Sequence, residues 1–382
     1  MFSFIRHWRN MVTRYALTLR AKNMERRTLK KVTRLSIYDV AAEAGCSHSA
    51  VAAVLSGKAK KIRIADATAA RIQAVARRMG YRPNALARAS RSGRSGVVAA
   101  IVSSVSREFV GRVMDGVLES LYERGQYTIK MLRSEIGAGL GSLLDECVEH
   151  RVEGVFCCDL TRSVDAGAII QDDPARRRLR IVHTNCGPDF PGLRIDPDDQ
   201  AGAMMAVDFL IALGHRRIGF IGGPTAEIYT VDNRRIGYRS AMLKAGLKIP
   251  DGFIQPAAWQ AEAVAVAARN ILTLNPRPTA LLAVNDEAAA ITIRVAAELG
   301  IKVPGDLSIV GFSDELLASF IQPTLTTIAQ PHADIGRRAI AALIEVAEST
   351  SDHTPTGVIL LPVKLIVRES TAAPPAPRPA GG

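Results

Sequence analysis

The side chains whose chemistry is clearest lie near the start of the chain, where small polar residues precede a run of Lys and Arg residues. In the segment 35–56, Ser47 is suited to cap a helix, and His48 and Ser49 follow it directly. A helix that enters the major groove of DNA presents the side chains of its first turn to the base edges. These residue types therefore indicate hydrogen bonding to bases and phosphates rather than catalysis.

Short helices must position these side chains. Apolar residues recur at helical spacing on both sides of Gly45, which can supply a turn, and Ala44 is small enough to let two helices approach. A third helix is expected over Ala67–Met79, so residues 35–83 are predicted to form an all-α helix-turn-helix head. The expected inward-facing residues are Ile37, Val40 and Ala41 on the first helix and Ala50, Val51, Val54 and Leu55 on the second.

The charge of the chain is unevenly distributed. Residues 1–95 contain 21 Lys or Arg against four acids (net +17), and residues 96–382 contain 28 bases against 33 acids (net −5), which together give the net charge of +12. A basic first quarter on a mildly acidic remainder is typical of a polyanion-binding module attached to a body with another task. A solvated basic tail would explain residues 1–34 but not the patterned stretch that follows.

Composition divides the rest of the chain. Residues 1–34 are expected to be a basic arm, either disordered or the product of a start codon assigned too early, and residues 84–95 have the composition of a hinge or linker. Residues 96–370 alternate apolar runs such as Val97–Val102 and Ile218–Ile221 with helical stretches, which predicts doubly wound parallel sheets. Because this length exceeds one ordinary sheet, we expect two lobes with a ligand cleft between them. The Pro/Ala-rich segment 371–382 is expected to be a disordered tail.

Several classes of protein are disfavoured. No apolar run approaches the roughly 18 residues of a membrane span, and five cysteines without a Cys-x-x-Cys pair favour reduced thiols in a cytoplasmic protein. The glycines of Gly137–Gly141 lack the spacing of a dinucleotide fingerprint, and the seven histidines do not cluster at metal-ligand spacing. We therefore expect no enzyme, no catalytic residue, no cofactor and no metal site.

Short matches along the chain carry a resemblance to a known family. They include Tyr38–Ala41, Gly80–Asn84, Gly214–Ile218, Asn285–Asp286, Ser308–Phe312 and Pro323–Thr327. In this order, the chain resembles the lactose-repressor (LacI/GalR) family of bacterial transcription regulators from Leu35 to about Val367. The resemblance implies a two-lobed, periplasmic-binding-protein-like α/β domain that binds a small effector. It also implies a repressor whose homodimer binds a pseudo-palindromic operator in double-stranded DNA.

Three features depart from the family pattern at the DNA-binding end. The exposed face of the second helix carries Ala52 and Ala53, the connection Gly57–Ile64 is long and basic, and Ser90 stands where a hinge leucine is expected. These departures keep open the alternative of a sugar-binding protein with little or no specific DNA binding. The expected DNA-contacting residues are Ser36, Tyr38, Ser47, His48, Ser49, Ala52, Ala53, Lys58, Lys60, Arg63, Arg82, Asn84, Arg88 and Arg91.

The resemblance also assigns candidate effector-binding residues by position. They are Phe109, Asn185, Arg234, Trp259, Asn285 and Ser313. Trp259 offers a flat apolar face and Arg234 a planar fork of donors, although Arg234 can instead be read as a surface ion-pair partner of Asp232. Many relatives have an aspartate where Ser313 stands, so the loss of that carboxylate favours a phosphorylated or carboxylated effector. The expected effector is a sugar, a sugar phosphate or a sugar acid.

Overall fold

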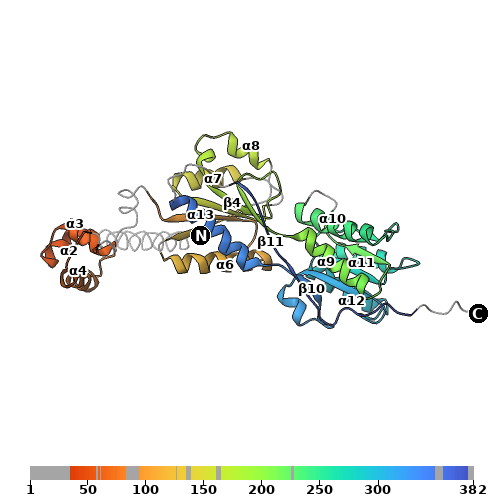
Figure 1. Cartoon of the computed structure of the whole chain (residues 1–382). Coiled ribbons are helices and arrows are strands. Elements are labelled where there is room, and N and C mark those ends of the chain that lie inside the picture. Colours follow the sequence, from red (N-terminus) through yellow and green to blue (C-terminus); the bar gives the residue numbers. More distant parts are fainter. Residues whose placement is uncertain are drawn as a thin grey trace, which may run out of the picture. The chain divides into compact units, whose positions relative to one another are not determined.

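The computed structural model divides the chain into two compact units, residues 1–91 and 92–382 (Figure 1). The predicted arm at residues 1–34 and the hinge position Ser90 lie outside the described residues. The residues that the structure describes are 35–56, 59–60, 62–82, 94–125, 127–134, 139–160, 165–224, 228–348 and 356–376.

The first unit contains the predicted helix-turn-helix, formed by α2 (Ile37–Ala44), α3 (His48–Leu55) and α4 (Asp66–Met79). Helix α2 starts with a capping box, in which the Asp39 carboxylate accepts a 2.7 Å hydrogen bond from the Ser36 backbone N–H. The small core contains four of the seven residues predicted to face inward, whereas Ile37, Ala50 and Leu55 are only half-buried at its edge. Its fully buried members are Val40, Ala41, Ala44, Val51, Val54, Ile72, Val75 and Ala76.

The second unit has two lobes, each built on a six-stranded sheet. In lobe 1 the strand order is β11-β5-β4-β3-β1-β2 and every pairing is parallel. Alternate residues of β1 enter two separate apolar clusters, so helices cover both faces, as a doubly wound sheet requires. The strands are β1 (Val97–Val102), β2 (Thr128–Arg133), β3 (Gly154–Cys158), β4 (Ile181–Thr184), β5 (Leu193–Pro197) and β11 (Gly357–Leu361). The helices are α6 (Glu108–Arg124), α7 (Leu140–Glu149), α8 (Ala166–Gln171), η1 (Arg176–Arg178) and α13 (His332–Glu348).

Lobe 2 has the strand order β12-β10-β9-β8-β6-β7. Its pairings are parallel except that β12 runs antiparallel to β10, so the predicted parallel sheet is confirmed and carries one antiparallel strand at its edge. The strands are β6 (Ile218–Ile221), β7 (Ile254–Gln255), β8 (Ala280–Ala283), β9 (Ser308–Ser313), β10 (Thr326–Ala329) and β12 (Lys364–Ile366). The helices are α9 (Asp199–Ala212), α10 (Tyr229–Lys244), α11 (Ala261–Leu272), α12 (Asp286–Glu298) and η2 (Leu316–Ser319).

The chain passes between the two lobes three times. It leaves lobe 1 between β5 and α9, returns between β10 and α13, and leaves again between β11 and β12. Late elements therefore complete the first sheet, and Figure 1 shows α13 beside α6. Their backbones meet at two glycines, because a Cβ at Gly336 would overlap the backbone oxygen of Val113, and one at Gly116 would overlap that of Ala333.

The expected disorder of residues 371–382 is wrong for the first part of that segment. Nε2 of the buried His215 lies 2.9 Å from the carbonyl oxygen of Ala372, and the Ala372 N–H donates to Ser308 Oγ at 3.0 Å. His215 Nδ1 lies 2.9 Å from the hydroxyl of Thr279. The imidazole therefore joins the end of the chain to lobe 2, which is the structural role expected for a buried polar side chain.

Candidate functional site

The exposed face of the head gathers the residues predicted to read DNA. Ser47 caps α3 by accepting a 3.2 Å hydrogen bond from the Ala50 N–H, and His48 and Ser49 are exposed in the first turn. The ring of His48 lies 5.1 Å from the ring of the exposed Tyr38, so two helices contribute to one surface. Ala52 and Ala53 are half-buried on the same helix.

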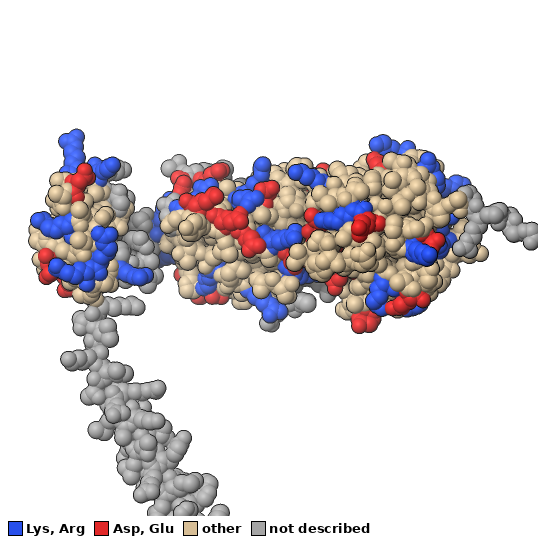
Figure 2. Space-filling model, turned by 90° about the horizontal axis from the view of Figure 1, so that it is seen from below, with Lys and Arg blue, Asp and Glu red and all other residues tan. Residues whose placement is uncertain are grey.

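Exposed basic side chains also lie on the described surface of the head. Lys60, Arg63 and Arg82 are exposed, and Figure 2 shows Lys and Arg side chains spread over this unit. Sequence reasoning did not identify three further exposed basic residues of α4, Arg71, Arg77 and Arg78, of which Arg78 pairs with Glu43. The four other predicted contacts, Lys58, Asn84, Arg88 and Arg91, lie outside the described residues.

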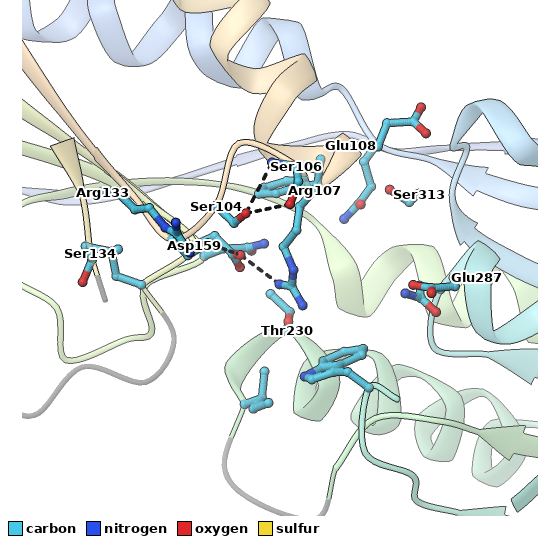
Figure 3. Close-up of a pocket in the computed structure, with 18 of the residues that line it drawn as sticks. Ser104, Ser106, Arg107, Glu108, Arg133, Ser134, Asp159, Thr230, Glu287 and Ser313 are labelled. Atoms are coloured by element: carbon cyan, nitrogen blue, oxygen red, sulfur yellow. Dashed lines mark hydrogen bonds and ion pairs between the residues drawn. The ribbon is translucent and has the colours of Figure 1, made fainter. Parts of the chain in front are cut away.

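The second unit contains a cavity of about 1090 Å³ between its two lobes (Figure 3). All six candidate effector-binding residues line it, although they come from segments spread over more than 200 positions. Most of them follow a strand or start a helix, where side chains emerge at the carboxyl edge of a parallel sheet. The lining residues that the sequence reasoning did not identify include Ser103, Ser104, Ser106, Arg107, Glu108, Arg133, Ser134, Asp159, Thr230, Gln260, Glu287, Glu315 and Gln330.

Arg234 is buried at the wall of this cavity. Its Nε and Nη2 lie 3.2 Å from Asp199 Oδ1, its Nη1 donates to the carbonyl of Val284 at 2.6 Å, and its guanidinium lies 4.1 Å from the ring centre of Phe312. Burial raises the pKa of Asp199, and Arg234 opposes that effect. The alternative of a surface pair with Asp232 is wrong, because Asp232 pairs with the neighbouring Arg235 at 2.9 Å.

Two asparagines present amide groups to the cavity. Asn285 caps α12 by accepting from the Ala288 N–H at 2.9 Å, which leaves its Nδ2 as the group to offer a ligand. Asn185 is 7% exposed, its backbone φ is 53°, and its Oδ1 has no partner among the described residues. A buried acceptor without a donor is costly, and because this oxygen is itself shielded from solvent, a ligand donor could reach it only after the Asn185 side chain rotates.

Ser313 and Phe109 both contact the buried side chain of His332. Ser313 Oγ lies 3.4 Å from His332 Nε2, and the Phe109 ring meets the His332 ring edge-on with centres 5.2 Å apart. Burial lowers the pKa of His332 to about 3, so the imidazole is neutral. The Gln330 side chain hydrogen-bonds to His332 at 3.2 Å and to Asp199 at 2.8 Å. It therefore links the part of the cavity wall around His332 to the part around Arg234.

Arg107 spans the middle of the cavity. Its Nη1 donates to Asp159 Oδ2 at 2.9 Å within lobe 1, and its guanidinium lies 5.6 Å from the ring centre of Trp259 in lobe 2. Ser103 Oγ also donates to Asp159 Oδ2, at 2.8 Å. Figure 3 shows the Arg107 side chain running down between these elements. One face of Trp259 is therefore already in contact with a cation.

A second contact between the lobes lies beside the cavity. The backbone N–H of Leu316 in lobe 2 donates to Glu108 Oε1 at 2.8 Å, and Arg112 Nη1 donates to the carbonyl of Asp314 at 2.8 Å. Glu108 and Arg112 pair with each other at 2.8 Å on α6. A change in the relative orientation of the lobes would have to break or replace these bonds.

The acidic side chains of lobe 2 change the electrostatics of the cavity. Glu287 and Glu315 line it, and neither has an ion-pair partner among the described residues. Burial raises the pKa of Glu315 to about 7, and the nearby carboxylates of Asp286, Glu108 and Glu287 act in the same direction. The described part of the chain contains no group of His, Cys, Asp and Glu that would hold a metal ion, and no described helix is long and apolar enough to cross a membrane.

A helix-turn-helix head followed by a two-lobed body with a central cavity defines the class of ligand-responsive DNA-binding regulators. The family of bacterial regulatory proteins of the lacI type matches residues 36–84, and a periplasmic binding protein-like domain matches residues 207–371. The ribose operon repressor of Escherichia coli K12 is 30% identical over 312 residues, which cover 81% of this chain and 92% of that protein.

Solved structures agree with this assignment. The cellobiose complex of the transcriptional regulator CelR is 27% identical with a TM-score of 0.65, and covers 88% of this chain and 100% of that one. The Lac repressor dimer bound to operator and the anti-inducer ONPF has the same fold, with a TM-score of 0.76, 23% identity, and coverage of 89% and 100%. The chain belongs to the LacI family of transcription regulators. It is a DNA-binding regulator controlled by a small-molecule effector, and the relatives named here are regulators rather than enzymes.

Proposed function

We propose that the protein is a cytoplasmic repressor that binds its operator as a homodimer and is controlled by a sugar or sugar-derived metabolite in the cavity between its lobes. One observation carries the proposal: six residues chosen from the sequence as effector contacts line a single cavity, to which both lobes contribute. Two-fold symmetry of the dimer would match a pseudo-palindromic operator.

The head would read DNA through the first turn of α3. His48 and Ser49 are exposed there and offer hydrogen bonds to base edges, and the half-buried Ala52 and Ala53 offer apolar contact to thymine methyl groups. The exposed bases Lys60, Arg63 and Arg82, together with Lys58, Asn84, Arg88 and Arg91, would contact phosphates, with Ser36, Tyr38 and Ser47 near the backbone. The small polar content of α3 favours an operator whose binding depends strongly on phosphate contacts.

Effector binding would act by changing the relative orientation of the lobes. Arg107 with Trp259 joins the lobes across the cavity, and Glu108 with Leu316 joins them beside it. A ligand that contacts both lobes has different affinities for the open and closed orientations of the lobes. Only through this difference in affinity can it shift the equilibrium between the two orientations. Catalysis is no part of the proposal. The structure of CelR in complex with cellobiose supports a carbohydrate as the ligand.

The proposal is tested by recovering genomic DNA bound to the full-length protein and measuring the affinity for the recovered duplex against a scrambled duplex. Specific binding should exceed non-specific binding by about a thousandfold or more at physiological salt. His48→Ala should reduce that ratio, whereas Arg239→Ala, a variant of an exposed base on lobe 2, should leave it unchanged. Equal affinity for both duplexes would instead support the alternative of a sugar-binding protein without specific DNA binding.

A further inference from the structure

We propose that the lobe 1 end of the cavity is an oxyanion subsite centred on Arg133, and that it binds the phosphate or carboxylate group of an anionic polyol. This inference rests on the proposed function in taking the cavity as the effector site, and it adds the location of the effector's charged group and the residues that would bind it.

Most polar residues at the Arg133 end of the cavity are donors, and the one carboxylate described there, Asp159, is paired with Arg107. Arg133 ends β2, Ser134 follows it, and Ser104 and Ser106 come from the loop after the neighbouring strand β1; all four line the cavity. The hydroxyls of Ser104 and Ser106 are 2.8 Å apart, and Ser104 Oγ also accepts from the Ser106 N–H at 3.3 Å. Whichever hydroxyl donates to the other, one O–H of the pair has its hydrogen left for a ligand.

A helix terminus contributes to the same wall. Helix α7 begins at Leu140, and the residue before it, Gly139, provides no side-chain cap. Gly139, Leu140 and Gly141 line the cavity together with Arg133. The first N–H groups of an uncapped helix carry partial positive charge and are common anion ligands, so they add to the cation and the hydroxyls.

Among the lining residues that the structure describes, the charged side chains without an ion-pair partner lie at the two ends of the cavity. Arg107 is paired with Asp159, and Arg234 with Asp199. Arg133 has no ion-pair partner among the described residues. Glu287 and Glu315 belong to lobe 2, and Figure 3 shows Arg133 and Ser134 on one side of the cavity with Glu287 and Ser313 on the other. An anion is therefore favoured at the Arg133 end and repelled at the lobe 2 end.

The remaining groups of the cavity are suited to hydroxyls. The carboxylates of Glu287 and Glu315 accept hydrogen bonds, and Asn185 Oδ1 is a buried acceptor without a partner among the described residues. A neutral sugar would satisfy these acceptors but leave Arg133 and the serine hydroxyls unused. A ligand with an anionic group at one end and hydroxyls at the other satisfies both ends.

Binding to the full-length protein tests the inference with matched pairs of probes. Stabilisation against thermal unfolding and calorimetric affinity are measured for inorganic phosphate, and for D-ribose against D-ribose 5-phosphate and D-glucose against D-glucose 6-phosphate, at constant ionic strength in chloride. We expect stabilisation by phosphate and tighter binding of the phosphorylated member of at least one pair. Arg133→Met should weaken that binding by about tenfold or more, the effect of losing a charge-assisted hydrogen bond.

Arg124→Met is the matched control, because Arg124 is exposed on the same lobe and does not line the cavity. Equal losses in the two variants, no stabilisation by any anionic probe, or neutral sugars that bind as tightly as their phosphates would each overturn the subsite. Circular dichroism melting of Arg133→Met separates lost binding from misfolding. Operator affinity is measured separately, so failure of the subsite and failure of the DNA-binding proposal give different results.

Discussion

Replacement of Glu315 by glutamine should stabilise the protein, and the gain should depend on pH. The carboxyl of Glu315 is half-buried at the cavity beside other carboxylates, and its pKa is raised from 4.5 to about 7. At about 1.4 kcal/mol for each pH unit, this difference corresponds to about 3 kcal/mol. The pKa of Glu315 is higher in the folded state than in the unfolded state. The contribution of this carboxyl to stability is therefore complete below pH 4.5 and is lost as pH rises through 7.

Glu315→Gln removes this titration while keeping the shape of the side chain. Its free energy of unfolding should therefore exceed that of the unmodified protein by up to about 3 kcal/mol at pH 8 and equal it near pH 4.5. Urea unfolding at a series of pH values, followed by circular dichroism, measures this difference. Glu262→Gln changes an exposed carboxyl on the same lobe and serves as the control. If the difference in unfolding free energy between the Glu315→Gln variant and the unmodified protein is the same at pH 5 and pH 8, the assignment of a destabilising buried charge to Glu315 is refuted.

Three further predictions concern other parts of the molecule. Gly336→Ala should lower the free energy of unfolding by about 1–3 kcal/mol, because its Cβ would overlap the backbone of α6, whereas Gly305→Ala has room and should change it little in the same urea titration. Arg82→Ala should weaken binding to all duplexes alike and reduce the slope of log K against log salt by about one in fluorescence anisotropy. Truncation before Ala372 should lower the melting temperature, because His215 and Ser308 lose partners there, while truncation after Ala376 should not.

Most of the fold follows from local patterns in the sequence. The apolar runs that became β1 and β6 mark strands buried on both faces, and their predicted ends agree with the structure. The identity of the first elements of both lobes was therefore predictable. Which segments complete each sheet was not, because α13 and β11 join lobe 1 through contacts with residues more than 150 positions earlier. Local periodicity contains no information about such pairings.

The functional site likewise has residues that were predictable from the sequence and contacts that were not. Arg234 was predicted as a cavity residue, but its ion-pair partner Asp199 was not identified, because the two residues lie 35 positions apart on different helices. The pairing of Arg107 with Asp159 was missed, because it depends on the register of β3 beside β1. A signal was nevertheless present: Asp159 directly follows a buried strand, as Asn185 does, and polar residues at that position face the cleft of a parallel sheet.

The threefold passage of the chain between the lobes has a consequence for biosynthesis. Lobe 1 contains the first half of the body, yet its sheet lacks an edge strand and its face lacks α13 until residues 332–361 have left the ribosome. Apolar surface of the nascent lobe 1 therefore stays exposed to solvent while the second lobe is translated. Contacts of such long sequence separation slow folding and expose intermediates to aggregation. Chaperone dependence during synthesis should accordingly be greatest before α13 emerges.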